Sequence, residues 1–169
     1  MLDNFVKMND WRSITEQLEP GESLQPKYHL LFWGLAAAYE SKGDSESAIN
    51  LIHESLKYNT ECPNCRWLLA CIMFLQGNSQ EAINIWTRII EDGEAYLMSN
   101  PCEACCDDME VADVVMPVIA DTYFMLSQSY ALTGDIARAR SFRDLFADDL
   151  RRGSKSRYKL GDLDDKIVW

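Results

Sequence analysis

The chain is poor in basic residues: 16 Lys and Arg stand against 27 Asp and Glu, which gives a formal net charge of −11 at pH 7. A chain of this charge repels the phosphates of nucleic acids and of anionic membranes. We therefore expect neither a nucleic acid nor a membrane among its ligands. The charge favours a basic or neutral protein or peptide as the partner.

Long hydrophobic runs are also missing. The longest uninterrupted run extends from Trp67 to Leu75, which is less than half of the roughly 20 residues that a membrane-spanning helix needs. The first residues, Met1 to Asn4, lack the basic and apolar regions of a signal peptide. These absences predict a cytoplasmic protein, in which the six cysteines are reduced thiols or metal ligands and not disulfides.

The sequence lacks the short motifs that mark common hydrolases and nucleotide-binding enzymes. It has no H-E-x-x-H zinc motif, no G-x-S-x-G nucleophile elbow and no G-x-x-x-x-G-K-[ST] phosphate loop. Its adjacent acidic pairs, Asp107-Asp108 and Asp148-Asp149, would point about 100° apart on a helix and make poor acid–base partners. We therefore predict that the protein is not an enzyme.

The chain does contain a turn phrase that recurs at a constant interval, as Asn9-Asp10-Trp11, Gly43-Asp44-Ser45 and Gly77-Asn78-Ser79. The interval is about 34 residues, and this period, with Asp or Asn after a turn residue, is typical of solenoids built from helix hairpins. A fourth phrase, Gly134-Asp135-Ile136, arrives later than the period predicts. The delay indicates an insertion between the third phrase and the fourth.

Each glycine turn is flanked by amphipathic patterns. A small residue follows five positions after each glycine, where the two helices of a hairpin would cross closely: Ala48, Ala82 and Ala139. Glycine suits the left-handed residue that ends a helix, and Asp44 or Asn78 suits the N-cap of the next helix. The pattern predicts helices at about 11–19, 27–42, 45–58, 63–76, 79–93, 118–133 and 136–152.

The period, the turn residues and the small residues together resemble the tetratricopeptide repeat (TPR) family. The resemblance implies an all-α fold, an α-solenoid of about 3.5 helix hairpins with a Cys-rich insertion before the last hairpin. A domain at 1–153 would contain a half repeat at 1–26, repeats at 27–61, 62–95 and 119–153, and an insertion at 96–118. The tail, 154–169, would cover the apolar edge of the last hairpin. Arg66 and Arg143 depart from the family pattern, which usually has aromatic residues there.

The resemblance also implies a binding surface, because tetratricopeptide arrays commonly bind peptides on the concave face formed by the first helix of each pair. Three aromatic residues in equivalent positions would either insert into a partner or pack beneath neighbouring segments. We expect a protein–protein interaction module, such as an adaptor, scaffold or assembly factor. The residues that this face would offer to a partner are Trp33, Glu40, Asn64, Trp67, Phe74, Phe124 and Gln128.

All six cysteines fall between residues 62 and 106, and four of them form two C-x-x-C pairs. The pairs lie at consecutive joins between repeats, which would stack on one edge of a solenoid. Four thiolates at one point suit tetrahedral zinc. A redox-active pair and ordinary buried thiols are the alternatives. The predicted ligands of a structural zinc ion are Cys62, Cys65, Cys102 and Cys105, with Cys106 as a substitute for Cys105.

Two other function classes stay open: a metal- or redox-responsive regulatory protein that uses the cysteine cluster, and a structural subunit of a homo-oligomer. The two histidines, His29 and His53, are isolated on predicted helices and are interpreted as packing or surface residues. A basic cluster either complements a helix C-terminal dipole or contacts a phosphate or an acidic partner. Its members are Arg151, Arg152, Lys155, Arg157 and Lys159.

Overall fold

The computed structural model describes residue 16, residues 25–106 and residues 111–164. Within these ranges all regular secondary structure is helical, and no strand occurs. The predicted half repeat at 1–26, with its helix at 11–19, lies almost entirely outside the described residues. None of the described helices combines the length and apolar character needed to cross a membrane.

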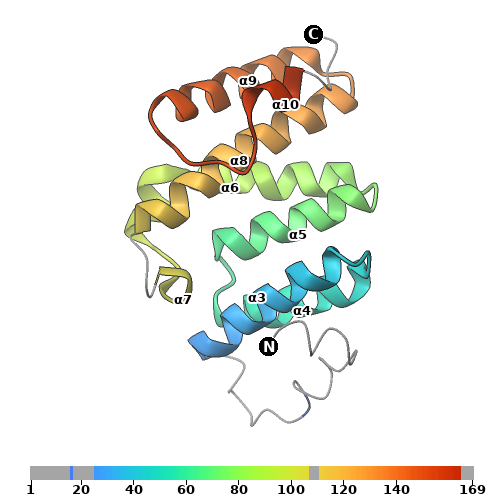
Figure 1. Cartoon of the computed structure of the whole chain (residues 1–169), viewed down its shortest axis with the longest axis vertical. Coiled ribbons are helices and arrows are strands. Elements are labelled where there is room, and N and C mark those ends of the chain that lie inside the picture. Colours follow the sequence, from blue (N-terminus) through green and yellow to red (C-terminus); the bar gives the residue numbers. More distant parts are fainter. Residues whose placement is uncertain (1–15, 17–24, 107–110, 165–169) are drawn as a thin grey trace.

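The long helices form three pairs that follow one another along the long axis of the molecule (Figure 1). Each pair packs closely, and successive pairs are joined by packing of α4 on α5 and of α6 on α8. Two short helices, α7 (Glu103–Cys106) and α10 (Leu160–Asp164), complete the described structure. The pairs are α3 (Pro26–Glu40) with α4 (Ser45–Tyr58), α5 (Pro63–Leu75) with α6 (Ser79–Ser99), and α8 (Val111–Leu132) with α9 (Ile136–Arg151).

The turn inside each pair has the geometry that the sequence predicts. The turn glycines adopt left-handed backbone angles, which end a helix without the steric cost that other residues incur. Their φ angles are 79° at Gly43, 85° at Gly77 and 86° at Gly134. The small residues five positions later are fully buried where the helices cross, at Ala48, Ala82 and Ala139.

Side-chain capping confirms the N-cap predicted at Asp44, differs from the prediction at Asn78, and adds a cap at Asp135. Asp44 accepts a hydrogen bond from the backbone N–H of Ser47 at 3.1 Å, and Asp135 accepts one from Arg138 at 3.0 Å. Each bond satisfies one backbone donor in the first turn of the following helix. Asn78 occupies the equivalent N-cap position but makes no side-chain capping bond.

The helices around the insertion are longer than the sequence pattern predicts. A kink at Gly93, with φ 76° and ψ 161°, interrupts α6, and a further stretch of helix beyond it buries Leu97. Helix α8 begins at Val111 and contains Pro117, so residues 111–117 of the insertion extend the helix predicted at 118–133. Most of the insertion is therefore helical and packed.

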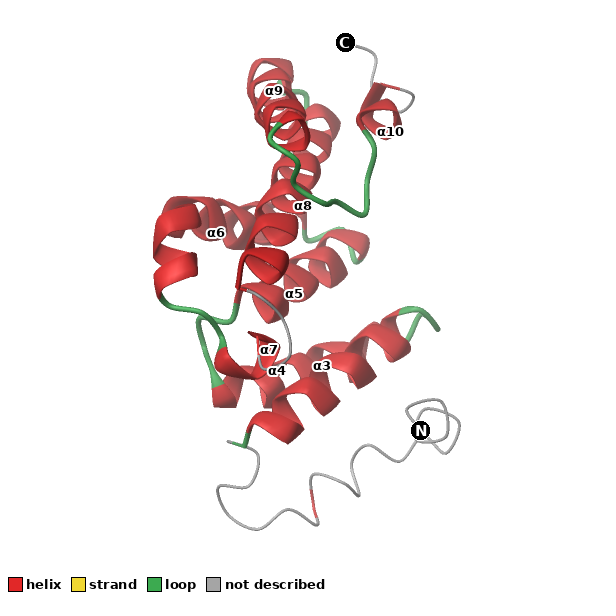
Figure 2. Cartoon of the chain, turned by 60° about the vertical axis from the view of Figure 1, so that its left-hand side comes forward, coloured by secondary structure: helices red, strands yellow, loops and turns green. Residues whose placement is uncertain are grey.

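After α9 the chain turns back, crosses the face of α8 and ends its described part in α10 (Figures 1 and 2). Helix α10 packs against α8 and α9 and buries Leu163 completely. Residues 154–164 therefore lie against the last helix pair.

Candidate metal centre

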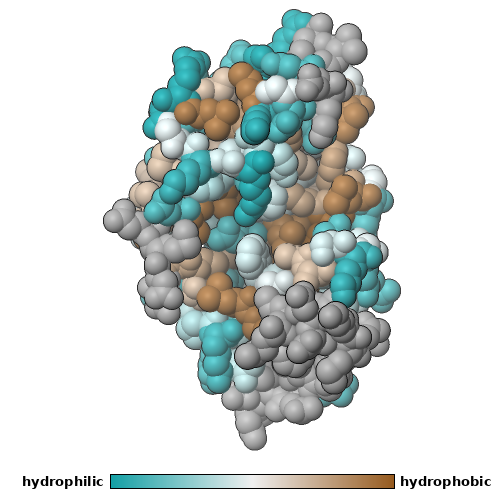
Figure 3. Space-filling model, viewed as in Figure 1, coloured by the Kyte–Doolittle hydropathy of each residue, from teal (hydrophilic) through white to brown (hydrophobic). Residues whose placement is uncertain are grey.

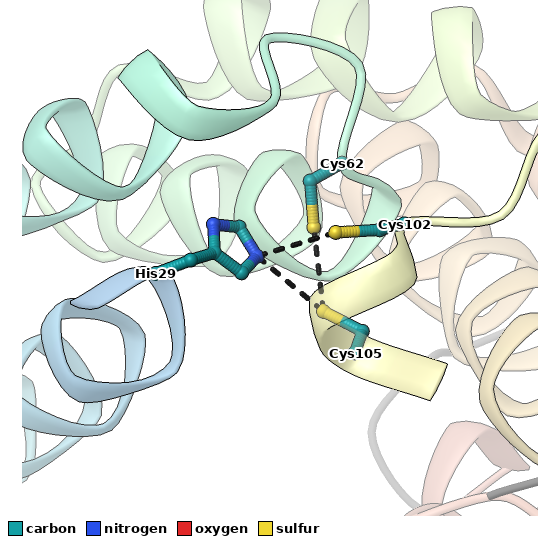
Figure 4. A group of neighbouring side chains, drawn as sticks. All are labelled: His29, Cys62, Cys102 and Cys105. Carbon is teal, nitrogen blue, oxygen red and sulfur yellow. Dashed lines mark hydrogen bonds between the residues drawn. The ribbon is translucent and has the colours of Figure 1, made fainter. Parts of the chain in front are cut away.

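Four side chains that can bind a metal ion meet near the start of α3, and they come from three separate segments (Figure 4). His29 lies in the first turn of α3 and Cys62 is the N-cap residue of α5. Cys102 precedes α7, and Cys105 lies within it. Cys105 is half-buried and the other three are buried. The cluster therefore joins the first helix pair, the start of the second pair and the insertion.

The distances between the ligand atoms match those of a tetrahedral metal site. Nε2 of His29 lies 3.4 Å from the Sγ atoms of both Cys102 and Cys105. The Sγ atoms of Cys62 and Cys105 are 3.6 Å apart, and all four ligand atoms lie within 4.8 Å of one another. With bonds of about 2.3 Å to sulfur and 2.1 Å to nitrogen, tetrahedral zinc places neighbouring ligand atoms about 3.6 to 3.8 Å apart. The donor atoms therefore fit such an ion after small side-chain shifts.

Contacts on the far side of the imidazole ring decide which nitrogen faces the cysteines. Nδ1 of His29 lies 3.0 Å from the carbonyl oxygen of Ser55, which can only accept, so Nδ1 carries a proton and donates it. The Ser55 hydroxyl in turn donates to the carbonyl oxygen of His29 at 2.9 Å. When Nε2 loses its proton to bind a metal, this arrangement directs its lone pair at the sulfur atoms, as outer hydrogen bonds do for metal-binding histidines.

Hydrogen bonds within the cluster shift the pKa values of its members. Burial disfavours the imidazolium, but hydrogen bonds with Cys102 and Cys105 outweigh it and raise the pKa of His29 to about 10. Hydrogen bonds from Cys105 and Cys62 hold the pKa of Cys102 far below that of an ordinary thiol. Their hydrogen bonds with Cys102 raise the pKa values of Cys105 and Cys62. The hydrogen bonds within the cluster thus shift the pKa values of its members in opposite directions.

The structure brings together three of the four predicted ligands and puts His29 in the place expected for Cys65. The Sγ atom of Cys65 lies 3.9 Å from Nε2 of His29 but only 3.2 Å from the hydroxyl oxygen of Ser55. Because Cys65 already belongs to the first turn of α5, it packs against α4 beside the cluster and is not one of the four converging ligands. Cys106, the predicted substitute, is half-buried and also lies outside this group.

His29 is the member of the cluster that the sequence pattern missed. An isolated histidine on an amphipathic helix is usually a packing residue, and it carries no motif of its own. A signal was present in the spacing, because His29 precedes Cys62 by almost one full period of the turn phrases. Residues one period apart fall on the same edge of successive helix pairs, where Cys62 also lies.

A cavity of about 280 Å³ lies next to the metal centre, between α3, α5, α8 and the C-terminal segment. Two of the predicted partner-binding residues, Trp33 and Asn64, line it, and Cys105 lines it as well. The cavity and the candidate metal site therefore share a wall. Its lining consists of Leu30, Trp33, Asn64, Cys105, Asp113, Val114, Pro117, Val118 and Arg157.

Two other predicted binding residues lie beneath the C-terminal segment. Trp67 is 8% exposed and Phe124 is 1% exposed. The guanidinium carbon of Arg157 lies 4.4 Å from the centre of the Trp67 ring, and the Tyr158 ring stacks on Phe124 with centroids 4.0 Å apart. Of the two interpretations open for these aromatic residues, packing beneath a neighbouring segment is the one that the structure shows.

The remaining predicted binding residues have partners within the chain or lie partly open. Glu40 accepts a hydrogen bond from the Ser45 hydroxyl at 3.1 Å, and the Phe74 ring packs 5.7 Å from that of Trp86. Gln128 is half-buried on α8.

The basic cluster is largely neutralised within the molecule. Arg151 and Arg152 form ion pairs with acidic residues one helical turn earlier on α9. Lys155 lies 3.2 Å from a carboxylate oxygen of Asp113. The cations near the end of α9 also have the sign that stabilises a helix C-terminus. Four of the five basic residues therefore form ion pairs with acidic side chains of the described part of the chain.

A comparison with models of known protein families finds no match to the chain. A comparison with curated proteins finds no significant relative. The function must therefore be inferred from the geometry of the chain itself.

Proposed function

We propose that this chain is a protein–protein interaction module of the tetratricopeptide type, a short solenoid whose insertion is held in place by a structural zinc ion. The observation that carries the proposal is the convergence of His29 Nε2 with three cysteine sulfur atoms at tetrahedral spacing. The left-handed turn glycines and the buried small residues at the helix crossings support the same hairpin architecture.

The donor set selects the metal. Three thiolates and one imidazole are the soft and borderline ligands that zinc prefers, whereas magnesium and calcium require oxygen ligands. A site with four protein ligands has no open coordination position for a substrate or a reactive water molecule, so its role is structural.

A bound zinc ion would organise the insertion. Helix α7 has only four residues, far fewer than the roughly 12 to 15 that an isolated helix needs to be stable in water. Bonds from Cys102 and Cys105 to zinc would fix this helix between α3 and α8, against which it packs. The same ion would tie α3 to the start of α5 through His29 and Cys62.

The cavity beside this centre is the part of the surface best suited to a partner. Trp33 and Asn64 line it, and Leu30, also in the lining, is 44% exposed at the surface. An apolar side chain that enters such a cavity can supply much of the binding free energy. Asp113 in the lining and the net charge of −11 favour a basic or neutral partner.

The zinc proposal is tested by metal analysis of protein purified under reducing conditions from its native host without added metal. We expect one zinc ion per chain, retained through dialysis against metal-free buffer. Folded protein whose cysteines all react in a thiol titration, but which contains no tightly bound metal, would contradict the proposal.

The interaction proposal is tested by placing a photo-crosslinking amino acid at Trp33 and irradiating the protein in an extract of its native host. The matched control carries the same amino acid at His53, which is exposed on α4 and is not among the residues that line the cavity. We expect a discrete crosslinked partner at position 33 and none at position 53. Identical products at both positions would mean that the cavity does not select a partner.

A second candidate function is metal-responsive binding, and one observation favours it. Cys105 belongs both to the metal centre and to the cavity wall. Loss of zinc would release α7 and change the shape of the cavity. If this is the function, crosslinking at position 33 should fall after a chelator removes the zinc and return when zinc is restored.

A further inference from the structure

The segment between α9 and α10 attaches to the molecule through a buried carboxylate. Asp121 on α8 is fully buried. Its Oδ1 atom accepts hydrogen bonds from the Ser156 hydroxyl at 2.5 Å and from the backbone N–H of Arg157 at 3.1 Å. Its Oδ2 atom lies 3.2 Å from Nη1 of Arg157. Since a buried carboxylate is costly without a cation, this position requires a positive group.

Two aromatic rings complete the surface on which the segment lies. The Arg157 guanidinium covers the face of Trp67 on α5, in a cation–π contact. The Tyr158 ring stacks almost parallel on Phe124 of α8, with an interplanar angle of 3°. Figure 3 shows hydrophobic residues next to hydrophilic ones in the middle of this face. Asp121, Trp67 and Phe124 thus form neighbouring sites for an arginine and a tyrosine, and we call them the docking groove.

The segment is held in the docking groove as a peptide ligand would be, mainly by side chains. The backbone N–H of Arg157 donates to the Asp121 carboxylate of α8. Those of Tyr158 and Lys159 donate locally, to the side chains of Ser156 and Asp162. The Arg157 side chain is 50% exposed despite its ion pair. On the C-terminal side the segment is anchored separately by the buried Leu163. The contacts of residues 156–158 with α5 and α8 are thus separate from the anchor at Leu163.

The fit of this segment is incomplete. Among the described residues, the indole nitrogen of Trp67 is buried without a hydrogen-bond acceptor. The Oδ2 atom of Asp121 likewise accepts no hydrogen bond of good geometry from this part of the chain. Buried polar atoms without partners cost free energy. A peptide that supplied these bonds would bind the groove more tightly than the chain's own segment.

We propose that the docking groove binds a segment of a partner protein in which arginine is followed by tyrosine, and that Ser156-Arg157-Tyr158 occupies it when no partner is present. This inference rests on the proposed function as an interaction module and names the chemistry of the partner. The arginine neutralises Asp121 and covers Trp67, while the tyrosine stacks on Phe124. The net charge of −11 favours the approach of a basic segment.

The test measures binding of a fluorescein-labelled peptide, with the sequence of residues 153–164, to the full chain by fluorescence anisotropy. One protein is the wild type and the other is the variant Arg157→Ala/Tyr158→Ala, in which the tethered segment is weakened but the groove is intact. The tethered segment competes at a high effective concentration, so the variant should bind the peptide at least about ten-fold more tightly than the wild type. Equal affinities would overturn the proposal.

The matched control is a peptide of the same composition and charge in which the arginine and the tyrosine exchange places. The variant should bind it about ten-fold more weakly, because each side chain then faces the wrong site. Equal binding of both peptides would mean non-specific attraction to an acidic protein and would overturn the proposal. Adding Asp121→Asn to the variant should weaken binding of the native-order peptide by a similar factor.

A milder variant covers the case in which the double variant does not fold. Ser156→Ala removes two hydrogen bonds of the segment, one to Asp121 and one from the backbone N–H of Tyr158, and leaves all aromatic contacts. Peptide affinity should therefore lie between those of the wild type and the double variant. A dimer of the wild type that grows with concentration in sedimentation would overturn the proposal in favour of exchange of this segment between two copies.

These titrations are independent of the tests of the proposed function. If the peptides fail to bind but crosslinking at Trp33 still identifies a partner, the docking groove alone is wrong. If the peptides bind as expected but the Trp33 crosslinker captures nothing, the groove is correct and the cavity is not the partner site.

Discussion

Nε2 of His29 lies 3.4 Å from the Sγ atom of Cys102, although 73 residues separate them along the chain. The contact exists because α7 packs on α3, which brings the insertion back to the first helix pair. A contact of this range closes a long loop, and a metal ion that fixes it removes conformational freedom from the unfolded chain. The metal centre should therefore affect the stability of the whole protein and not only of the insertion.

Removal of zinc should lower the melting temperature. A ligand present at 100 times its Kd stabilises a protein by about 2.7 kcal/mol, which in a chain of this size corresponds to about 5 to 10 °C. Differential scanning calorimetry with zinc and with a chelator measures the shift. Cys102→Ser should abolish the zinc-dependent shift, whereas Cys106→Ser, the same change outside the cluster, should keep it. A shift of the same size in both variants would argue against the site.

The ligand set can be resolved by comparing two cysteines of one C-x-x-C pair. Cys62→Ser removes a ligand and should weaken zinc binding by about a hundred-fold or more, whereas Cys65→Ser removes a neighbour and should weaken it by less than about ten-fold. Competition with a chromogenic chelator measures both affinities. The absorption of the cobalt-substituted wild type should correspond to three thiolates. The reverse ranking of the two variants would restore the four-cysteine site predicted from the sequence.

Zinc binding should release about three protons per ion at pH 7. Cys62 and Cys105 keep their protons because their pKa values are raised. The third proton resides on His29, whose pKa of about 10 lies well above 7, because the pKa of Cys102 is held far below that of an ordinary thiol. This proton of His29 must leave when Nε2 binds the metal. Affinity should therefore fall as pH decreases below 7, because protons compete for the ligands.

The measurement is titration calorimetry in two buffers of different ionisation enthalpy, from which the number of released protons follows directly. Release of one proton or fewer would mean that thiols do not form the site. The same experiment on Cys65→Ser should give an unchanged number, because Cys65 is not among the converging ligands.

The turn glycines should be required for their backbone conformation alone. A Cβ atom at Gly134 would meet no atom within 4 Å, but its φ of 86° is left-handed. Gly134→Ala should therefore lower the free energy of unfolding by about 1 to 2 kcal/mol, as measured by urea denaturation. Gly161→Ala, in equally open space within α10, should be neutral or stabilising by up to about 1 kcal/mol. Equal effects at both positions would contradict this explanation.

Local features of the sequence predicted most of the helix boundaries. Helices 45–58 and 136–152 were placed within one residue of α4 and α9, because Asp44 and Asp135 cap the start of each one. The kinked extension of α6 beyond Gly93 was missed, since a left-handed glycine usually ends a helix. Membership of the tetratricopeptide family stays a prediction.

The sequence by itself determined the helical hairpins and the presence of a cysteine-rich centre. Helical periodicity, capping and left-handed glycines act between residues within about one turn of each other, so they can be read from the chain directly. Only the tertiary structure decided that His29 joins the centre in place of Cys65, and that residues 156–158 cover Trp67 and Phe124. Those contacts depend on how distant helices pack and on the path of an irregular segment, and neither leaves a periodic signal in the sequence.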